Sequence, residues 1–166
     1  MKATLRRAKE ITQIKVLSVG LGHEDCSRLA TIFTHSDWPS GPDHDWKLQS
    51  STTLRAAVSA WQKEAPHIIV CEKSPGSDSW RDLLDPMLQL SDPPSLIVAS
   101  RIADEYLWAE ALNLGAYDVL AAPFDPAEVM RVLCSAWLHR IHRKQVHPSR
   151  AMRAAAASAD SYLAAG

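Results

Sequence analysis

Three short, uninterrupted apolar runs constrain the fold of this chain more than any other feature of its sequence. They are IKVLSV, HIIVC and SLIVA, at residues 14–19, 67–71 and 95–99. Runs of this length without polar alternation are typical of strands that are buried on both faces, as in a parallel sheet. A weaker run at 117–122 (YDVLAA) predicts a fourth buried strand, and the alternating WKLQS at 46–50 predicts an edge strand.

Helical patterns occupy the intervals between these runs. Apolar residues recur at helical spacing in five segments, at 24–34, 53–64, 78–90, 103–114 and 126–145. Strand and helix therefore alternate along the chain, and this order predicts an open parallel sheet with helices on both faces. In α/β sheets of this kind, functional groups gather at the carboxyl ends of the strands.

Individual residues mark where these helices begin, bend and end. We expect Ser51 or Thr52 to cap the second helix and Asp125 to cap the last one. Pro86 lacks a backbone N–H and is expected to kink or split the third helix, and Gly115 is expected to end the fourth. Helical spacing in the first helix predicts a buried side made of Cys26, Leu29, Ala30 and Phe33.

The length and composition fit one globular domain. The chain has 166 residues, of which 46% are hydrophobic, and a formal net charge of −1. Such a chain can build a core, and its bulk charge favours neither nucleic acid nor a membrane. We expect a lead-in over residues 1–12, a folded domain over 13–146, and an Ala-rich tail over 147–166 that is helical or mobile.

The sequence predicts a cytoplasmic protein without a membrane span. No apolar run reaches the roughly 18 residues that a span needs, and the basic start is not followed by the apolar segment of a signal peptide. Cys26, Cys71 and Cys134 lie far apart and, being three, cannot all pair with one another. This cysteine usage suits a reducing compartment.

A carboxylate stands at the end of the third predicted strand. In HIIVCEKSPG (67–76) the apolar run ends at Cys71, and Glu72 follows shortly before a Pro-Gly turn. Because the carboxyl ends of parallel strands are where this architecture places its chemistry, Glu72 is the first candidate site residue.

Several segments together resemble the receiver domain of response regulators in bacterial two-component (phosphorelay) signalling. The most specific is GAYDVLAAPFDPAEVMRVL (115–133), and PHIIVCEKSPGSDSW (66–80), PPSLIVAS (93–100) and IKVLSVG (14–20) match in order and spacing. The resemblance covers about residues 13–143. It implies a flavodoxin-like α/β fold, with a five-stranded parallel sheet in the order 2-1-3-4-5, and a signalling role rather than an enzymatic one.

The resemblance also implies which positions carry phosphoryl transfer, and most of them are replaced. Working receivers place two acids after the first strand, an aspartate after the third, a hydroxyl after the fourth and Lys-Pro after the fifth. Together these groups hold a divalent cation and the transferring group. The matching positions here are Gly20 and Leu21, Glu72, Ala99 with Ser100 beside it, Ala122 before Pro123, and Val119 at the aromatic reporter position. We therefore expect a pseudo-receiver without metal or other cofactor.

Three interpretations of Glu72 stay open. It is a permanent negative charge that mimics a phosphorylated aspartate, a solvated surface carboxylate, or a residual phosphoacceptor, a role that Asp78 is also placed to take. The acids Glu24 and Asp25 are expected to act as favourable charges at a helix N-terminus. A small-molecule site in the strand-end crevice is a further alternative, with thin support from the glycines of GLGHED (20–25).

Two other kinds of site are expected to be absent. His139 and His142 share a helix face but have no evident third ligand, so metal binding is not expected. The stretch 139–153 contains five Lys/Arg and no acid, and we expect a solvated helix end there rather than a nucleic-acid site. The remaining histidines that we considered, all expected at the surface, are His35, His44 and His67.

Protein contact is the expected mode of action. In receivers the fourth helix, fifth strand and fifth helix form the usual dimer surface, and the resemblance places Trp108 and the last helix there. The predicted partner is a signalling protein or a second copy, bound through a patch that includes Trp108 or Trp137. Trp61 and Trp137 also fit helical core stripes. The sequence contains no nucleophile elbow, no phosphate-binding glycine motif and no HExxH.

Overall fold

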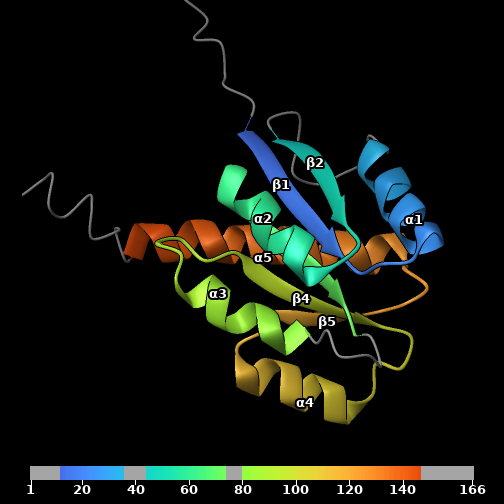
Figure 1. Cartoon of the computed structure of the whole chain (residues 1–166). Helices are drawn as coiled ribbons and strands as arrows, with labels where there is room; N and C mark the ends of the chain where they lie inside the picture. The colour runs from blue at the N-terminus through green and yellow to red at the C-terminus, as the bar shows by residue number, and fades with distance from the viewer. Residues whose placement is uncertain (1–11, 36–43, 74–79, 147–166) are drawn as a thin grey trace, which may run out of the picture.

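Five strands form one parallel sheet at the centre of the molecule (Figure 1). The structure is a computed structural model that describes residues 12–35, 44–73 and 80–146. The strands lie in the order β2-β1-β3-β4-β5, so the predicted flavodoxin-like order is confirmed. Their bounds are Thr12–Val19 (β1), His44–Ser51 (β2), Ile68–Glu72 (β3), Ser95–Ser100 (β4) and Asp118–Ala121 (β5).

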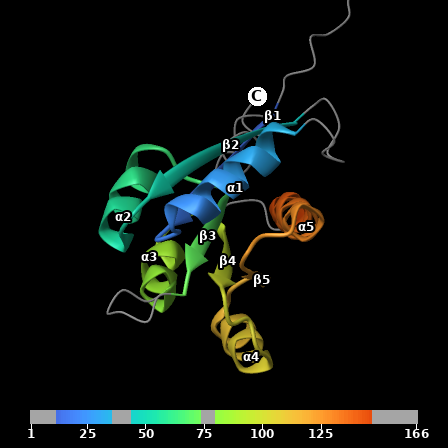
Figure 2. The ribbon, with the colours of Figure 1, turned by 90° about the vertical axis from the view of Figure 1, so that its right-hand side faces the viewer.

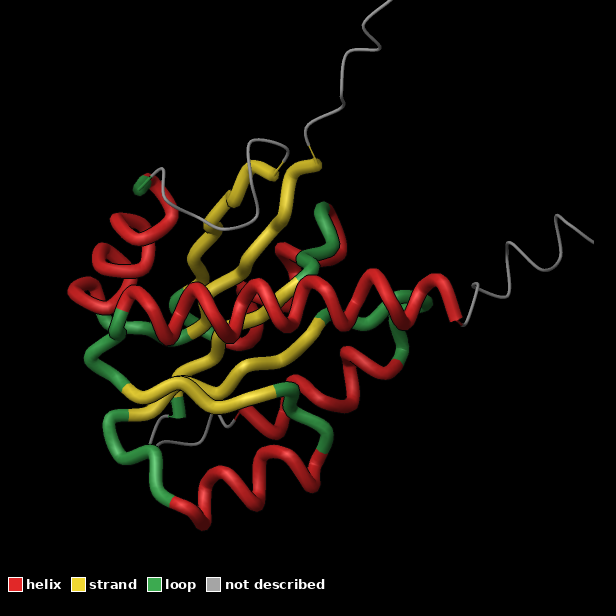
Figure 3. Tube along the Cα trace, turned by 180° about the vertical axis from the view of Figure 1, so that it is seen from behind, coloured by secondary structure: helices red, strands yellow, loops and turns green. Residues whose placement is uncertain are grey.

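Helices cover both faces of this sheet. Figure 2 shows α1 and α5 on one side of the strands and α2, α3 and α4 on the other, and Figure 3 shows the long α5 crossing the sheet. Among the helices of the described residues, none combines the length and the apolar composition that crossing a bilayer requires. The helix bounds are His23–Thr34 (α1), Leu54–Lys63 (α2), Leu84–Leu88 (α3), Glu105–Leu114 (α4) and Pro126–Val146 (α5).

The uninterrupted apolar runs become strands with two buried faces. Side chains alternate between the faces of a strand, so each run supplies both cores at once. In β3, Val70 packs with the helices α1 and α5, whereas the next residue, Cys71, packs with the other three helices. All six residues of β4 are buried, and in the edge strand β2 the buried Trp46 stands between the exposed residues Asp45 and Lys47.

The predicted helix ends agree with the structure at three places. Asp125 caps α5, because its carboxylate accepts the Glu128 N–H at 2.9 Å, and Pro126 is the first helical residue. Gly115 ends α4 with φ +105°, a left-handed conformation that favours glycine. The third predicted helix is split into a 3-10 turn, Trp80–Leu83, followed by α3. Pro86 lies in the first turn of α3, where its missing N–H has no intrahelical partner to lose.

Two details of the helix prediction are wrong. The cap of α2 is Thr53, not Ser51 or Thr52, because its hydroxyl accepts the Ala56 N–H at 3.2 Å. Ala30, predicted to be buried, is exposed, and Asp25 takes a buried place in α1 instead. A small side chain at the edge of a helical stripe gives a weak signal, and an acid is not expected inside a core.

Several predictions fall on residues that the structure does not describe. They concern the lead-in apart from its last residue, Thr12, the tail over 147–166, and Asp78. The turn-rich sequence THSDWPSGPDHD also predicts a long loop over 34–45, of which residues 36–43 are not described. Thr34 ends α1, and His44 and Asp45 open β2, so both ends of that predicted loop belong to regular structure.

His67 links three strands at the amino end of the sheet rather than standing free at the surface. Its Nδ1 accepts the Lys15 N–H at 3.0 Å, its own N–H donates to the Lys15 carbonyl, and its carbonyl accepts the Ser95 N–H. The ring is half-buried and packs against Trp137, with 5.1 Å between ring centroids. Burial, the largest cause, and the cations Arg140, Lys144 and Lys15 together lower the pKa of His67 from 6.5 to about 4, against a smaller opposing effect of Asp92.

This pKa predicts a loss of stability in mild acid. In the unfolded chain His67 takes up a proton below about pH 6.5, whereas in the folded chain it does so only near pH 4. The free energy of unfolding is therefore unaffected by His67 above pH 6.5 and falls as the pH drops from 6.5 to 4. Between pH 7 and pH 5 we expect a loss of about 1–2 kcal/mol, after allowing for solvent screening of a half-exposed ring.

A His67→Asn variant tests this prediction by urea unfolding. Its amide oxygen can accept the Lys15 N–H in place of Nδ1 but does not titrate. We expect the free energy of unfolding of this variant to change less between pH 7 and pH 5 than that of the wild type. Equal losses in the two proteins would contradict the role given to His67.

Candidate functional site

Three candidate residues meet at the carboxyl end of the sheet. Glu72 is the last residue of β3, is half-buried, and lies in register with Ala99 of β4. A Cβ placed on Gly20, just after β1, would lie 4.0 Å from the Cβ of Glu72. Gly20 has φ +72°, and its N–H donates to the Ser51 carbonyl at 2.9 Å. The structure therefore brings Gly20, Glu72 and Ala99 together, at the end of the sheet where they were predicted.

The main polar contact at this end is an ion pair that the sequence did not reveal. Asp25, in the first turn of α1, is only 2% exposed, and its Oδ2 accepts a hydrogen bond from the Arg101 guanidinium at 2.8 Å. Arg101 follows β4 directly and is more than half exposed. Asp25 does lie in the first helical turn, as expected of a favourable charge at a helix N-terminus, and in addition its carboxylate is buried and paired with a guanidinium.

Ser100 is engaged in a local turn. Its hydroxyl donates to the Ile102 carbonyl at 3.0 Å and accepts the Ile102 N–H at 3.1 Å. Both hydrogen bonds fix the chain that leads from β4 to α4. A hydroxyl held in this way stabilises the turn, and would have to leave these bonds to contact a group on Glu72.

The end of β5 offers no cation to the site. Val119 is fully buried in the core between the sheet and α4, and Ala122, at the position of the receiver lysine, is half-buried. The Ala122–Pro123 peptide is cis, and the Ala122 N–H donates to the Ser100 carbonyl at 2.9 Å. The guanidinium of Arg28 in α1 donates to the Phe124 carbonyl and so ties this loop to the first helix.

A divalent cation does not fit this arrangement. Within residues 12–35, 44–73 and 80–146, no three His, Cys, Asp or Glu side chains gather closely enough to hold a metal ion. Mg²⁺ needs oxygen ligands in a near-octahedral set, and Gly20 and Leu21 have no side-chain oxygen to offer. The one buried carboxylate nearby, Asp25, is paired with Arg101.

Cys71 is not a candidate nucleophile either. Burial and, to a smaller extent, the neighbouring Glu72 carboxylate raise the pKa of its thiol to about 12. The thiolate is the reactive form of cysteine, so Cys71 stays protonated and inert at neutral pH.

The tryptophans proposed for an interface are half-buried. Trp108 packs against the core beneath α4, and Trp137 packs against the core beneath α5 and the ring of His67. Trp61, predicted to be a core residue, is 4% exposed, as expected. The large exposed apolar side chains on and beside α4 are others, which the sequence did not single out: Ile102, Tyr106, Leu112 and Leu114.

The histidines of the last helix do not form a site with a third ligand among the described residues. His139 packs against the ring of Tyr117 at 5.4 Å between centroids, and His142 is exposed. His35, at the end of α1, is exposed as predicted, and its Nδ1 lies 2.7 Å from the Thr31 carbonyl.

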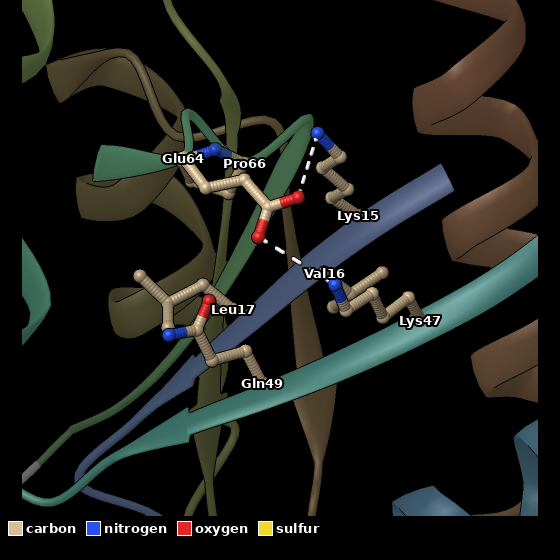
Figure 4. A pocket seen from close by; sticks show the side chains of 7 residues that line it. All are labelled: Lys15, Val16, Leu17, Lys47, Gln49, Glu64 and Pro66. Atoms are coloured by element: carbon tan, nitrogen blue, oxygen red, sulfur yellow. Dashed lines mark ion pairs between the residues drawn. The ribbon is translucent and has the colours of Figure 1, made fainter. Parts of the chain in front are cut away.

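A shallow hollow lies at the opposite, amino end of the sheet. Figure 4 shows Lys15 of β1 and Lys47 of β2 reaching from two sides to the carboxylate of Glu64. The hollow is lined by these residues together with Val16, Leu17, Gln49 and Pro66. It is far from the strand-end crevice that the small-molecule hypothesis requires.

Breaking the Asp25–Arg101 pair should destabilise the fold. Arg101→Ala leaves a buried carboxylate without this partner, and we expect a loss of about 1–3 kcal/mol in the free energy of unfolding. Arg101→Lys should recover part of the loss, because it restores the charge. In Asp25→Asn/Arg101→Ala the buried group is neutral, so the loss should be smaller than in Arg101→Ala alone.

Urea unfolding of the four proteins measures these differences, and Arg55→Ala serves as the control. Arg55 is an exposed residue of α2, so its truncation should change stability by no more than about 0.5 kcal/mol. If Arg101→Ala lowers the free energy of unfolding no more than Arg55→Ala does, the ion pair does not stabilise the fold.

Comparison with known proteins gives structural matches only. No family model matches the chain, and no curated protein matches it. Among solved structures, the signal receiver domain of an HD domain-containing protein from Pseudomonas fluorescens Pf-5 is 19% identical, with a TM-score of 0.62 over 78% of this chain and 98% of that one. The chemotaxis protein CheY4 of Vibrio cholerae is 15% identical, with a TM-score of 0.61 over 75% of this chain and 99% of that one.

A pilus assembly protein is also similar. CpaE from Caulobacter crescentus CB15 is 21% identical, with a TM-score of 0.58 over 75% of this chain and 94% of that one. At these identities the matches concern architecture. The chain has the α/β fold of response-regulator receiver domains, built on a five-stranded parallel sheet in the order 2-1-3-4-5.

Proposed function

We propose that this chain is a receiver-like signalling module that works through protein contacts and without phosphorylation. The proposal rests on which residues occupy the carboxyl end of the sheet. Glu72 stands there beside Gly20 and Ala99, and the nearest buried acid, Asp25, is paired with Arg101. The fold of a receiver is present, and the groups that phosphoryl transfer depends on are replaced.

Electrostatics explains why these replacements matter. A transferring phosphoryl group carries negative charge that metal ions and cationic side chains must stabilise. In this chain Gly20 and Leu21 offer no metal ligand, and Ala122 offers no cation. Glu72 already supplies a negative charge at the place where a receiver acquires one, which supports its role as a permanent mimic of the phosphorylated state.

The competing hypothesis keeps Glu72, or Asp78 outside the described residues, as a phosphoacceptor. Incubation with acetyl phosphate and Mg²⁺ followed by intact mass measurement separates the two ideas. We expect no phosphoryl adduct, because the site lacks the groups that lower the barrier. An adduct that Glu72→Gln or Asp78→Asn abolishes would overturn the proposal, and a working receiver domain treated in parallel shows that the donor is active.

Exposed apolar side chains support protein contact at α4. Ile102 is 72% exposed and Tyr106 is 87% exposed, and Leu112 and Leu114 are each nearly half exposed. Several large apolar side chains at the surface of one helix are typical of a protein interface. Trp108 is half-buried in the same helix, about 200° around it from Tyr106, and packs against the core. We infer that a second copy or a signalling partner binds the face of α4, β5 and α5.

Charge placed on this patch should prevent self-association. We expect the wild type to form a dimer at high concentration in light scattering, and Ile102→Asp/Tyr106→Asp to shift it to a monomer, because two desolvated carboxylates oppose burial. Leu88→Asp is a control on another helix, because Leu88 is 73% exposed on α3. A wild type that stays monomeric, or a dimer that only Leu88→Asp disrupts, would contradict a homodimer through α4.

A further inference from the structure

Cations gather around two carboxylates at the amino end of the sheet, away from the carboxyl-end site. In the first cluster, Glu64 after α2 accepts Lys15 at 2.8 Å and Lys47 at 3.5 Å (Figure 4). The two lysines come from adjacent strands and approach one acid. One positive charge of this cluster is therefore not balanced by an acid within it.

The second cluster has a larger excess of positive charge. Asp92, just before β4, is shared by Arg140, Arg143 and Lys144 of α5, with Lys144 at 2.7 Å and Arg143 at 3.7 Å. Arg140 is 3% exposed, and its Nη1 also donates to the Pro93 carbonyl at 2.6 Å. Arg143 donates to that carbonyl at 2.7 Å. Two positive charges remain here beyond the one that Asp92 balances.

His67 connects the two clusters. Its ring accepts the backbone N–H of Lys15 from the first cluster and packs on Trp137, which lies about one helical turn before Arg140 and two turns before Lys144 of the second. Charges from both clusters act on its ring. We call the set formed by Lys15 and Lys47, on the side of the sheet covered by α2, and by Arg143 and Lys144 of α5, on the other side, with the buried Arg140 that anchors it, the amino-end basic surface.

The described part of α5 beside this surface is basic, although the whole chain is not. Residues 129–146 carry four Lys/Arg and no acid, in a chain with a formal net charge of −1. The strand β1 begins at this end of the sheet and α5 ends beside it. Segregation of charge by sign in this way creates a local positive field that favours an anionic partner.

We propose that the amino-end basic surface binds an acidic segment of a partner protein. The acidic residues within the surface indicate which class of partner it binds. Glu64 and Asp92 are 39% and 34% exposed at the side chain and stand between the cations. A nucleic acid, with one charge per roughly 1.7 Å of duplex, would bring phosphates against them. A peptide with spaced carboxylates can place each acid between two cations, as Glu64 already does between Lys15 and Lys47.

An anionic membrane fits this surface less well than a peptide. Binding in the lipid interface needs apolar side chains beside the basic ones. Among the described residues of α5, two large apolar side chains are exposed: Leu138 lies about 200° around the helix from Arg140, and Val146, three residues after Arg143, is a single apolar side chain beside the cations. The surface shares α5 with the face of the proposed function but none of its α4 residues, so Arg143→Glu/Lys144→Glu and Ile102→Asp/Tyr106→Asp test the two interfaces separately.

The test measures binding of a fluorescein-labelled peptide of alternating Glu and Ser to the full chain at low ionic strength. We expect binding that weakens with added salt and that exceeds binding of the matching Gln-Ser peptide at least tenfold. Arg143→Glu/Lys144→Glu should weaken binding at least tenfold, and Lys47→Glu, on the edge strand, should weaken it independently. Circular dichroism confirms that each variant is folded.

The control and two competing ligands make each outcome decisive. Arg55→Glu/Lys73→Glu changes the net charge by the same amount at exposed positions outside the surface, and should leave peptide binding within about twofold of the wild type. Equal loss in this control, or no preference for the acidic peptide, would overturn the proposal. So would tighter binding of a DNA duplex or of phosphatidylglycerol vesicles, because the partner would then not be a protein.

Discussion

Burial of the central strands on both faces is the constraint on which the rest of this structure depends. The strands β3 and β4 are apolar almost throughout and lie between two layers of helices, so they offer no place for a charged group along their length. Polar chemistry is thereby confined to the two ends of the sheet, where strands give way to turns. Each end is tied by an ion pair with one nearly inaccessible member, Asp25 with Arg101 at one and Arg140 with Asp92 at the other.

The two ends of the sheet differ in the charge that their ion pairs leave uncompensated. At the carboxyl end the buried member is an acid, and its guanidinium partner covers it from solvent. At the amino end the buried member is a cation, and one acid is shared among three positive groups. The ion pair at the carboxyl end is therefore neutral in itself, with Glu72 beside it as a separate negative charge, whereas the cluster at the amino end keeps an excess of positive charge. This contrast is why the first supports a loss of phosphoryl chemistry and the second supports recruitment of an anionic partner.

The sequence predicted the architecture well because its signals are local. Apolar runs, the Pro126 and Gly115 markers and helical spacing each depend on a few neighbouring residues, and strand order followed from the family resemblance. The ion pairs at the ends of the sheet join segments that are far apart in the sequence, and no local sequence pattern predicts them. Asp25 and Arg101 are 76 positions apart. One signal was available, since Arg140 continues the buried stripe of Val129, Leu133 and Ala136 at helical spacing, and a cation at such a position calls for an acidic partner.

The Asp25–Arg101 bond has a consequence for how such a module could carry information. It joins the start of α1 to the turn that leads into α4, and Ser100 stiffens the same turn from within. Contacts that hold this turn in one arrangement lower the population of any other arrangement that phosphorylation could favour. If the module works without phosphorylation, as proposed, its output would follow the amount of protein and the supply of its partners, so gene dosage and turnover would be the variables that a cell can adjust.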